Sequence, residues 1–492
     1  MIKKWIEPSF GLIDEMLNFH TCRASGISFI ENRDIEISKD DNQFKFTFFS
    51  SYQEHRLIDQ ARTSNLDQFH FSSQEKTYVV SNESRITSYR DCFEENLGFS
   101  CTISSQCIYS EDIDSKREYY FRYIIPIGEE KVDFRDYSSF SFNHYFSGNE
   151  IWSTELIKIH LNDKEYHFYN IKVENDSYLI IDSTTHCDFK GIDKIALSIL
   201  VSYGFLSATI HLNEAYIIVS DEQSFTEPIG IYYKSLRNTL KGQYTIFTTN
   251  AYSVLVPIAK NRDPENGETN AIATIKEDRW SDKLAMFDEE IFSNLVQLVY
   301  DDDAILRSAM MIVEASTFAI DIQLGVYCVA FETITNQIMN KNKLKPPTII
   351  NKRVWKNNIK PKFMEIINLM NEENNGILGK EQIKFLEYKI NDFNKPTNRD
   401  TLMLPFIKLE YALSKDELEC IDYRNRSLHG TLPILEGENE MDKLFYVNLT
   451  FHKLCSILIL KLAGFNGYII NNIKLHEQNI KRKIDLDGFV KI

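Results

Sequence analysis

A chain of 492 residues is too long for a single hydrophobic core, so its length predicts two or three domains. Hydrophobic residues make up 43% of the chain and aromatic residues 13%, a composition that excludes a disordered protein. The net charge of −16 excludes a uniformly basic surface, so any nucleic-acid site would have to be a local basic patch.

Residues up to about position 275 have the pattern of β-strands. Alternating, β-branched or aromatic runs are separated by turn residues such as those at 162–163 and 174–176. The runs at 166–173 and 178–181 are expected to form a hairpin, and residues 192–205 a helix. The expected strands are residues 35–37, 44–48, 118–127, 156–161, 166–173, 178–181, 209–219 and 244–256. Residues 1–275 are therefore predicted to form an antiparallel β-rich domain, such as a sandwich.

The pattern becomes helical after a polar, turn-rich stretch at 261–268, which is predicted to be a linker. Apolar residues then recur every three or four positions. The first helix is expected to begin at Asp282 or Asp288. The later helices are expected at 304–313, 320–339, 380–391, 414–429 and 440–463. Residues 282–480 are therefore predicted to form an all-α bundle, which makes the chain a multidomain α+β protein.

Between positions 341 and 362 every charged residue is basic, although the chain as a whole is acidic. A Pro-Pro pair at 346–347 rules out one continuous helix through this segment. Because the segment lies between two expected helices, it is predicted to be a loop or an insertion of short helices.

No membrane segment is expected. The apolar stretch at 309–334 is interrupted by Glu314 and Asp321, and the stretch at 454–463 is too short to span a bilayer. Glu7 and Pro8 follow the first residues where a secretory leader would be apolar. The eight cysteines are scattered without metal-binding spacing, so no metal and no other cofactor is expected. These features predict a soluble cytoplasmic protein.

The helix expected at 414–429 has clear signals at both ends. Ser414 with Glu417 three residues later is a capping box. Gly430 and Pro433 would end the helix directly after His429. The sequence therefore predicts a histidine at a helix C-terminus.

One face of this helix combines apolar and polar residues. At about 100° per residue, the central stripe consists of Leu418, Ile421, Asn425 and Leu428. Arg424 and His429 lie on opposite rims of the stripe. An apolar stripe with polar rims would suit a contact with a second helix.

The motif Arg424-Asn425 with His429 five positions after the arginine resembles the HEPN superfamily of ribonucleases. Its spelling is most similar to the Apea-like HEPN domains of bacterial antiviral defence proteins. An upstream segment, Ala330-Phe331-Glu332, resembles the glutamate-bearing helix of that branch. The resemblance covers only the last two-fifths of the chain. It implies a HEPN-like bundle and the candidate catalytic residues Arg424, His429, Asn425 and Glu332.

The chemistry that the resemblance implies is RNA cleavage without a metal. The 2′-hydroxyl of the substrate attacks the adjacent phosphodiester, His429 transfers protons, and Arg424 stabilises the negative charge of the transition state. Asn425 would orient a neighbour or the substrate, with a plain core amide as the equal alternative. Glu332 would position Arg424 by an ion pair, with an unrelated ion pair as the alternative. The alternatives are a helix end whose histidine is favoured by the dipole, and a HEPN fold that binds without cutting.

A second group of residues would bind RNA without taking part in the chemistry. In the basic segment, lysines and an arginine would contact phosphates and a tryptophan would stack on a base; a solvated loop is the alternative. The candidate RNA-binding residues are Arg426, Lys352, Arg353, Trp355 and Lys356.

The resemblance therefore implies a metal-independent endoribonuclease that acts as a homodimer. It also implies a role in antiphage abortive infection, in which the N-terminal domain would sense a phage-derived trigger. The alternative function is that of a non-catalytic HEPN-fold binding or dimerisation protein.

Overall fold

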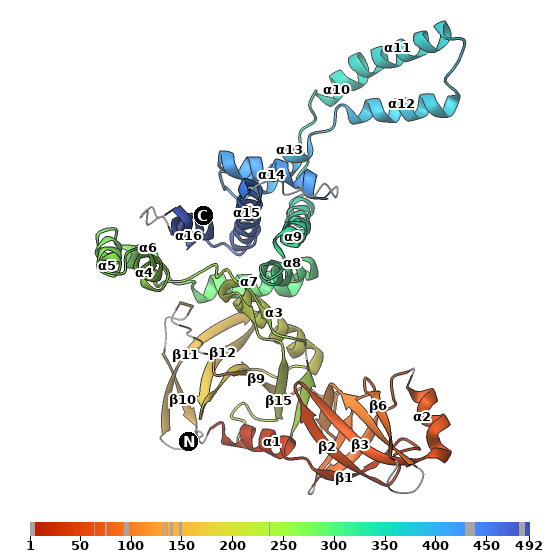
Figure 1. Cartoon of the computed structure of the whole chain (residues 1–492), viewed down its shortest axis with the longest axis vertical. Coiled ribbons are helices and arrows are strands. Elements are labelled where there is room, and N and C mark those ends of the chain that lie inside the picture. Colours follow the sequence, from red (N-terminus) through yellow and green to blue (C-terminus); the bar gives the residue numbers. More distant parts are fainter. Residues whose placement is uncertain are drawn as a thin grey trace. The chain divides into compact units, whose positions relative to one another are not determined.

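The computed structural model describes residues 5–492 apart from 63, 74–75, 93–97, 131, 133, 135, 138–140, 147–149, 236, 429–437 and 482–487. Only the backbone is described at 52, 55, 60, 89, 91–92, 141–146, 150–154, 425–428, 438–440 and 477–481. The chain divides into two compact units, one formed by Met1–Phe318 with Ala463–Ile492 and the other by Ala319–Leu462. The first unit contains the β-sheet and the second is helical, as the sequence predicts (Figure 1).

The largest sheet of the first unit is antiparallel, and its fifteen described strands are hydrogen-bonded edge to edge in the order β10-β11-β12-β13-β9-β15-β16-β8-β5-β4-β1-β2-β3-β7-β6. The strands are β1 (Thr21–Ser25), β2 (Arg33–Asp40), β3 (Gln43–Ser51), β4 (Phe69–Ser73), β5 (Lys76–Val80), β6 (Arg85–Cys92), β7 (Gly98–Ser105), β8 (Cys107–Ser110), β9 (Tyr120–Gly128), β10 (Ser141–Phe146), β11 (Glu150–Leu161), β12 (Lys164–Val173), β13 (Asp176–Ser183), β15 (Glu214–Ser220) and β16 (Gly230–Ser235). The predicted hairpin is formed by β12 and β13, with Val173 opposite Asp176.

Helix α3 (Phe189–Ser207) is the helix that the sequence predicts at 192–205. The Asp188 carboxylate caps it by accepting a hydrogen bond from the Gly191 amide at 2.8 Å. A side chain at Gly204 would lie 2.6 Å from the Ile210 Cα, so only glycine permits the return of the chain into β14 (Thr209–Ile210). Strand β14 pairs with β17 (Leu240–Lys241) outside the large sheet.

A buried ion pair within the sheet also contacts the N-terminal helix α1 (Glu7–Leu17). Arg122 on β9 donates to both oxygens of Asp182 on β13, at 2.8 and 2.9 Å, and its side chain is fully buried. The guanidinium also donates to Ser9 of α1 at 3.4 Å. Burial alone would lower the pKa of Arg122, but the carboxylate of Asp182 outweighs it and holds that pKa above its ordinary value.

The first unit includes helices that the sequence assigns to the helical domain. They are α7 (Glu289–Asp301) and α8 (Asp303–Ala315), and α7 packs on β11, where Ser293 accepts a hydrogen bond from the His160 amide at 3.0 Å. The C-terminal residues also belong here, since the Ile470 amide donates to the Ile246 carbonyl at 2.9 Å. The unit boundary therefore lies after Phe318, whereas the sequence places the helical domain at 282–480.

The strand predicted at 244–256 is wrong, because residues 244–250 form no strand and a helix starts at residue 251. Helix α4 (Ala251–Arg262) begins there, with the Asn250 side chain accepting from the Tyr252 and Ser253 amides. The linker predicted at 261–268 becomes a turn between two helices. The remaining elements of this unit are η1 (Tyr52–Glu54), α2 (His55–Ala61), α5 (Gly267–Glu277), α6 (Trp280–Lys283), β18 (Tyr468–Ile470), α16 (Asn472–Lys481) and β19 (Phe489–Lys491).

The second unit consists of helices in its described part. They are α9 (Ile320–Lys341), α10 (Lys352–Val354), the π-helix η2 (Trp355–Ile359), α11 (Lys360–Glu373), α12 (Lys380–Asp392), α13 (Asn398–Lys408), α14 (Lys415–Leu428) and α15 (Glu438–Leu462). The core lies between α9, α13 and α15, where the Phe331 ring packs 5.4 Å from Phe451 and 6.0 Å from Phe406. Helix α9 ends before the Pro-Pro pair, and the segment after it forms short helices as predicted.

The apolar part of helix α15 is longer than the stretch 454–463 identified in the sequence. Over Met441–Leu462 it is the one helix among the described residues that is long and apolar enough to cross a membrane. However, 78% of this window is buried inside the protein, where α15 packs against α9. Its apolar character is therefore explained by its place in the core.

Candidate functional site

The structure brings together two of the four candidate catalytic residues, Arg424 and Glu332. Arg424 lies on α14 and Glu332 on α9, 92 positions apart in the chain. The Arg424 Nε donates to the Glu332 Oε1 at 2.6 Å, and Nη2 donates to the same oxygen. The arginine side chain is only 11% exposed and the glutamate 32%. The predicted ion pair is thus present, and it fixes the guanidinium against α9.

The start of α14 is fixed by the predicted capping box. The Glu417 amide donates to the Ser414 hydroxyl at 3.2 Å, and the Ser414 amide donates to the Glu417 carboxylate at 2.7 Å. Glu417 is also buried, and it accepts from Tyr411 at 2.9 Å and forms an ion pair with Lys453 of α15 at 2.7 Å. Burial alone would raise the pKa of Glu417, but Lys453 and the hydrogen bonds outweigh it and hold that pKa below its ordinary value.

The role of Glu417 in joining α14 to α15 was not predicted. The spacing from Ser414 signals a helix cap, but nothing local in the sequence relates Glu417 to Lys453 on another helix. Together, the capping box and the ion pair fix the helix that carries Arg424.

The apolar stripe of α14 is used within the chain. Ile421, at the centre of the stripe, is buried, and α14 contacts both α9 and α15. Ile421 therefore packs within its own chain, whereas Leu418 is only partly buried, and the role of the stripe in a dimer stays a prediction. The side chains of Asn425, Arg426 and Leu428 lie outside the described residues, as do His429, Gly430 and Pro433. Their predicted roles stay predictions.

The titratable groups packed between α9 and α15 are neutral near pH 7. Burial lowers the pKa of His452 on α15 to about 4, and its ring faces Tyr327 at 5.8 Å. Burial raises the pKa of the Cys328 thiol to about 12, with Arg424 acting weakly in the opposite direction. A neutral thiol is a poor nucleophile, and a histidine with this lowered pKa is a weak base. These two side chains are therefore not the groups that would carry acid–base chemistry.

Trp355 is more buried than a stacking role would lead one to expect. It is 8% exposed, and its ring lies 6.1 Å from that of Phe363. Its predicted contact with a base stays a prediction. Lys352, Arg353 and Lys356 are exposed, so they keep the accessibility that a phosphate contact requires.

Removing the carboxylate of Glu332 should destabilise the helical unit. Glu332→Ala would leave the half-buried Arg424 without this acceptor, at a cost of about 1–3 kcal/mol. Glu332→Gln keeps an acceptor oxygen and should cost less. The control is Asp422→Ala, which removes the exposed partner of Arg399 and should cost at most about 1 kcal/mol. Chemical denaturation of the four proteins measures these differences, and equal losses for Glu332→Ala and Asp422→Ala would contradict the role of the buried pair.

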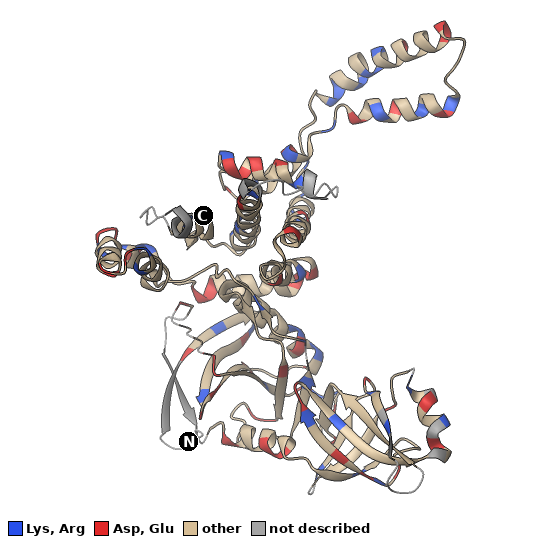
Figure 2. Cartoon of the chain, in the orientation of Figure 1, with Lys and Arg blue, Asp and Glu red and all other residues tan. Residues whose placement is uncertain are grey.

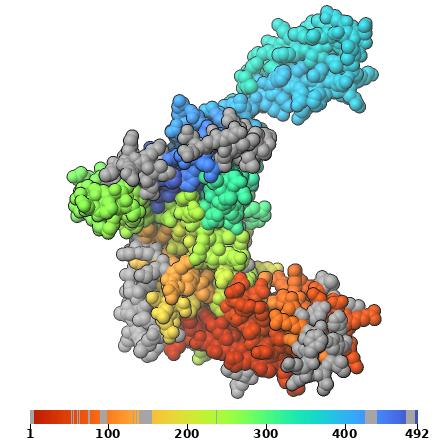
Figure 3. Space-filling model, in the orientation of Figure 1, coloured from red at the N-terminus to blue at the C-terminus, as the bar shows by residue number. Residues whose placement is uncertain are grey.

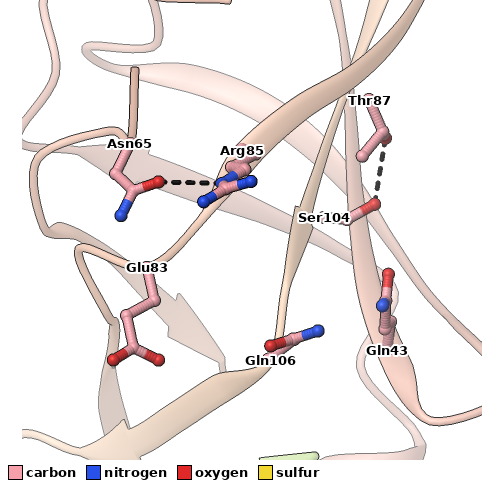
Figure 4. A pocket seen from close by; sticks show the side chains of 7 residues that line it. All are labelled: Gln43, Asn65, Glu83, Arg85, Thr87, Ser104 and Gln106. Carbon is pink, nitrogen blue, oxygen red and sulfur yellow. Dashed lines mark hydrogen bonds between the residues drawn. The ribbon is translucent and has the colours of Figure 1, made fainter. Parts of the chain in front are cut away.

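A separate polar pocket lies in the first unit, between β3, β6 and β7. It has a volume of about 440 Å³ (Figure 4). Within it the Arg85 Nε donates to the Asn65 side chain at 2.8 Å, and the hydroxyls of Thr87 and Ser104 are 2.9 Å apart. The lining residues are Gln43, Asn65, Glu83, Arg85, Thr87, Ser104 and Gln106. The pocket is therefore lined by amides, hydroxyls and one charged side chain of each sign, and such groups can hydrogen-bond a polar ligand.

Among the described residues no group of three or more His, Cys, Asp or Glu side chains could hold a metal ion. Comparison with known proteins found no matching protein family, no similar characterised protein and no similar solved structure. The function is therefore inferred from the motif of α14 and from the geometry around Arg424.

Proposed function

We propose that this protein is a metal-independent endoribonuclease of the HEPN type. The observation that carries the proposal is the Arg424–Glu332 pair, which joins the two segments in which the sequence resembles Apea-like HEPN domains. Two helices 92 positions apart meet at the residues that this resemblance names. A chance match of the six-residue motif would not require a glutamate of α9 to lie against its arginine.

In the proposed mechanism the substrate supplies its own nucleophile. His429 removes the proton from a ribose 2′-hydroxyl, and the oxygen attacks the neighbouring phosphorus atom. The bond to the 5′-oxygen of the next nucleotide breaks, and that oxygen takes up a proton. Arg424, which stays charged at all physiological pH values, stabilises the additional negative charge on the phosphate oxygens. Glu332 acts as a positioning residue because it limits the orientations of the guanidinium.

The remaining parts of the chain would supply binding and control. Lys352, Arg353, Lys356 and Arg426 would bind phosphates away from the reacting bond. The β-rich unit would sense a phage-derived trigger, and its polar pocket is a candidate for a polar ligand. Cleavage of cellular RNA by a cytoplasmic homodimer would then arrest an infected cell, which is abortive infection.

Expression in bacteria tests this function. Wild-type protein, with its trigger if one is needed, should arrest growth and degrade RNA, and His429→Ala should relieve both effects while accumulating to the same level. A non-catalytic binding protein is the alternative, and it would leave RNA intact in both cases. Toxicity that persists unchanged in His429→Ala would contradict the nuclease.

A further inference from the structure

The hairpin formed by α11 and α12 exposes a large apolar surface. No residue of α11 is buried, and Ile390 is the only buried residue of α12. On α11, Ile366 is 54% exposed and Met370 58%, and Ile377 in the turn is 73% exposed. Figure 3 shows the hairpin in cyan as one continuous surface made by the two helices. Scattered apolar residues on a surface are normal, but a contiguous set of this size marks a contact site.

Two helices of this length would not be stable on their own contacts. Isolated helices shorter than about 12–15 residues are marginal in water. Helices α11 and α12 contain 14 and 13 residues, and they bury almost nothing between them. The stabilisation that they lack is available if their apolar faces are covered by another surface.

The charges of the helical run formed by α10, η2 and α11 are reversed relative to its dipole. The run begins at Lys352 with Lys352 and Arg353 in its first turn, continues through Lys360 and Lys362, and ends with Glu372 and Glu373 in its last turn (Figure 2). The N-terminus of a helix favours acidic residues and the C-terminus basic ones, so each end of this run has the unfavourable sign. Lys360 is compensated by Glu387 of α12 at 2.8 Å. Lys362, Glu372 and Glu373 have no ion pair in the described part of the chain.

A second copy of α11, packed antiparallel, would place opposite charges beside the unfavourable charges at both ends of the helix. Its acidic C-terminus would lie beside the basic N-terminus of the first copy, and the reverse would hold at the other end. The charged residues of 360–395 also balance, with six basic and six acidic side chains, so two hairpins would not repel each other as wholes. Lys380 and Glu381 begin α12 beside the turn, so that end carries both signs of charge. A second hairpin offers both signs in return, whereas a phosphate backbone offers negative charge alone.

The two ends of the hairpin also differ in their apolar surfaces. Near the base, Phe393 is 60% exposed and packs edge-to-face on Phe363, with 6.0 Å between ring centroids. Near the turn, an apolar hollow of about 300 Å³ opens between the helices. Its lining residues are Ile367, Met370, Asn371, Asn374, Ile377, Leu378 and Leu386. An antiparallel pairing places the aromatic base of one hairpin beside the hollow of the other.

We propose that the α11–α12 hairpin binds the same hairpin of a second copy of this chain, antiparallel, to form an intermolecular four-helix bundle. The contact is two-fold symmetric, so each copy contributes one aromatic base and one apolar hollow. This inference does not depend on the nuclease proposal. It assigns dimerisation to the inserted hairpin, because Ile421 in the α14 stripe is already buried within its own chain.

Sedimentation velocity of the full-length protein over a range of concentrations tests the apolar part of the contact. Ile366→Asp with Met370→Asp should raise the dimer dissociation constant at least about tenfold, because both side chains would be buried only in the dimer. The matched control is Leu57→Asp on α2, which is 52% exposed and lies outside the hairpin. It should leave the dissociation constant unchanged. Circular dichroism checks that all variants keep their helix content.

Exchange of charges tests the antiparallel direction. Lys362→Glu should weaken the dimer, and so should Glu372→Lys with Glu373→Lys, because each variant places like charges against each other. Mixing the two variants should restore association to within a few-fold of wild type, since both contacts of the mixed pair are again between opposite charges. Restoration in the mixture cannot arise from misfolding of either variant.

Several results would overturn the proposal. Wild-type protein that stays monomeric at every concentration would do so, as would a dimer that the Ile366 and Met370 substitutions leave unchanged. Variants that lose retention of single-stranded RNA but sediment like wild type would assign the surface to RNA. Binding of wild type to phosphatidylglycerol vesicles without any change in mass would assign it to a membrane. None of these results bears on whether Arg424 is needed for cleavage, so the two proposals fail separately.

Discussion

Replacing Arg424 with alanine should lower the rate of RNA cleavage by at least about 100-fold, and His429→Ala should lower it by about 10²–10⁴-fold. The first loss is the electrostatic stabilisation of the transition state, and the second is proton transfer. Arg424→Lys keeps the charge but cannot reproduce the two bonds to Glu332, so it should recover little activity. Cleavage rates of the purified proteins on a labelled RNA measure these effects.

The stability of these variants separates a chemical role from a structural one. Arg424→Ala removes a half-buried ion pair but leaves Glu332 exposed enough to be hydrated, so the free energy of unfolding should fall by only about 1 kcal/mol. Arg399→Ala is the matched control, since Arg399 forms an exposed ion pair with Asp422 in the same unit at 2.7 Å. It should retain full activity. If Arg399→Ala and Arg424→Ala lost activity equally, the assignment of Arg424 would be wrong.

The largest effect on stability is expected at Asp182. Asp182→Ala leaves the fully buried Arg122 without its carboxylate, and breaking a buried pair on one side costs about 3–5 kcal/mol. Tyr169 would also lose its acceptor, since its hydroxyl donates to Asp182 at 2.7 Å. The unfolding transition of the first unit should therefore move to a clearly lower denaturant concentration. Tyrosine and tryptophan fluorescence follows this transition.

A double substitution checks the cause of this loss. Arg122→Met with Asp182→Leu removes both charges, and replacing a buried ion pair by apolar residues is often neutral or stabilising. The double variant should therefore be more stable than Asp182→Ala alone. A double variant as unstable as the single one would show that packing around these positions, and not the unpaired charge, is what matters.

Local signals in the sequence were sufficient for many elements. The capping box of Ser414 and Glu417 places the start of α14, and the Pro-Pro pair places the end of α9. The hairpin of β12 and β13 follows from two alternating runs around a turn. In each case the residues that determine the structure are neighbours in the chain.

The errors have different physical origins, some in nearby residues and some in contacts between distant ones. Residues 251–256 have a strand-like apolar run, but Asn250 caps a helix there and Leu255 is buried within this unit. Trp355 is more buried than its position in a basic segment suggests, and its ring lies 6.1 Å from that of Phe363. The division after Phe318 follows from the packing of α7 on β11, which no local pattern signals.

The candidate site combines features that a local sequence signal predicts with features that only the folded structure reveals. Arg424 was selected by a local motif, whereas Glu332 was selected by the resemblance alone, and the structure joins them. Composition could not reveal that Glu417 links α14 to Lys453, or that Ile421 is covered by its own chain. The role of the α11–α12 hairpin was equally hidden, because exposure of its apolar residues is a property of the fold.

The chemical ends of the RNA products test the central claim most directly. Because the attacking group is the ribose oxygen of the substrate, wild-type protein incubated with RNA in EDTA should yield a 2′,3′-cyclic phosphate and a 5′-hydroxyl. Mass spectrometry of the fragments distinguishes these ends from those of metal-dependent nucleases. Products with a 5′-phosphate that form only with magnesium would contradict the mechanism, even if the protein cuts RNA.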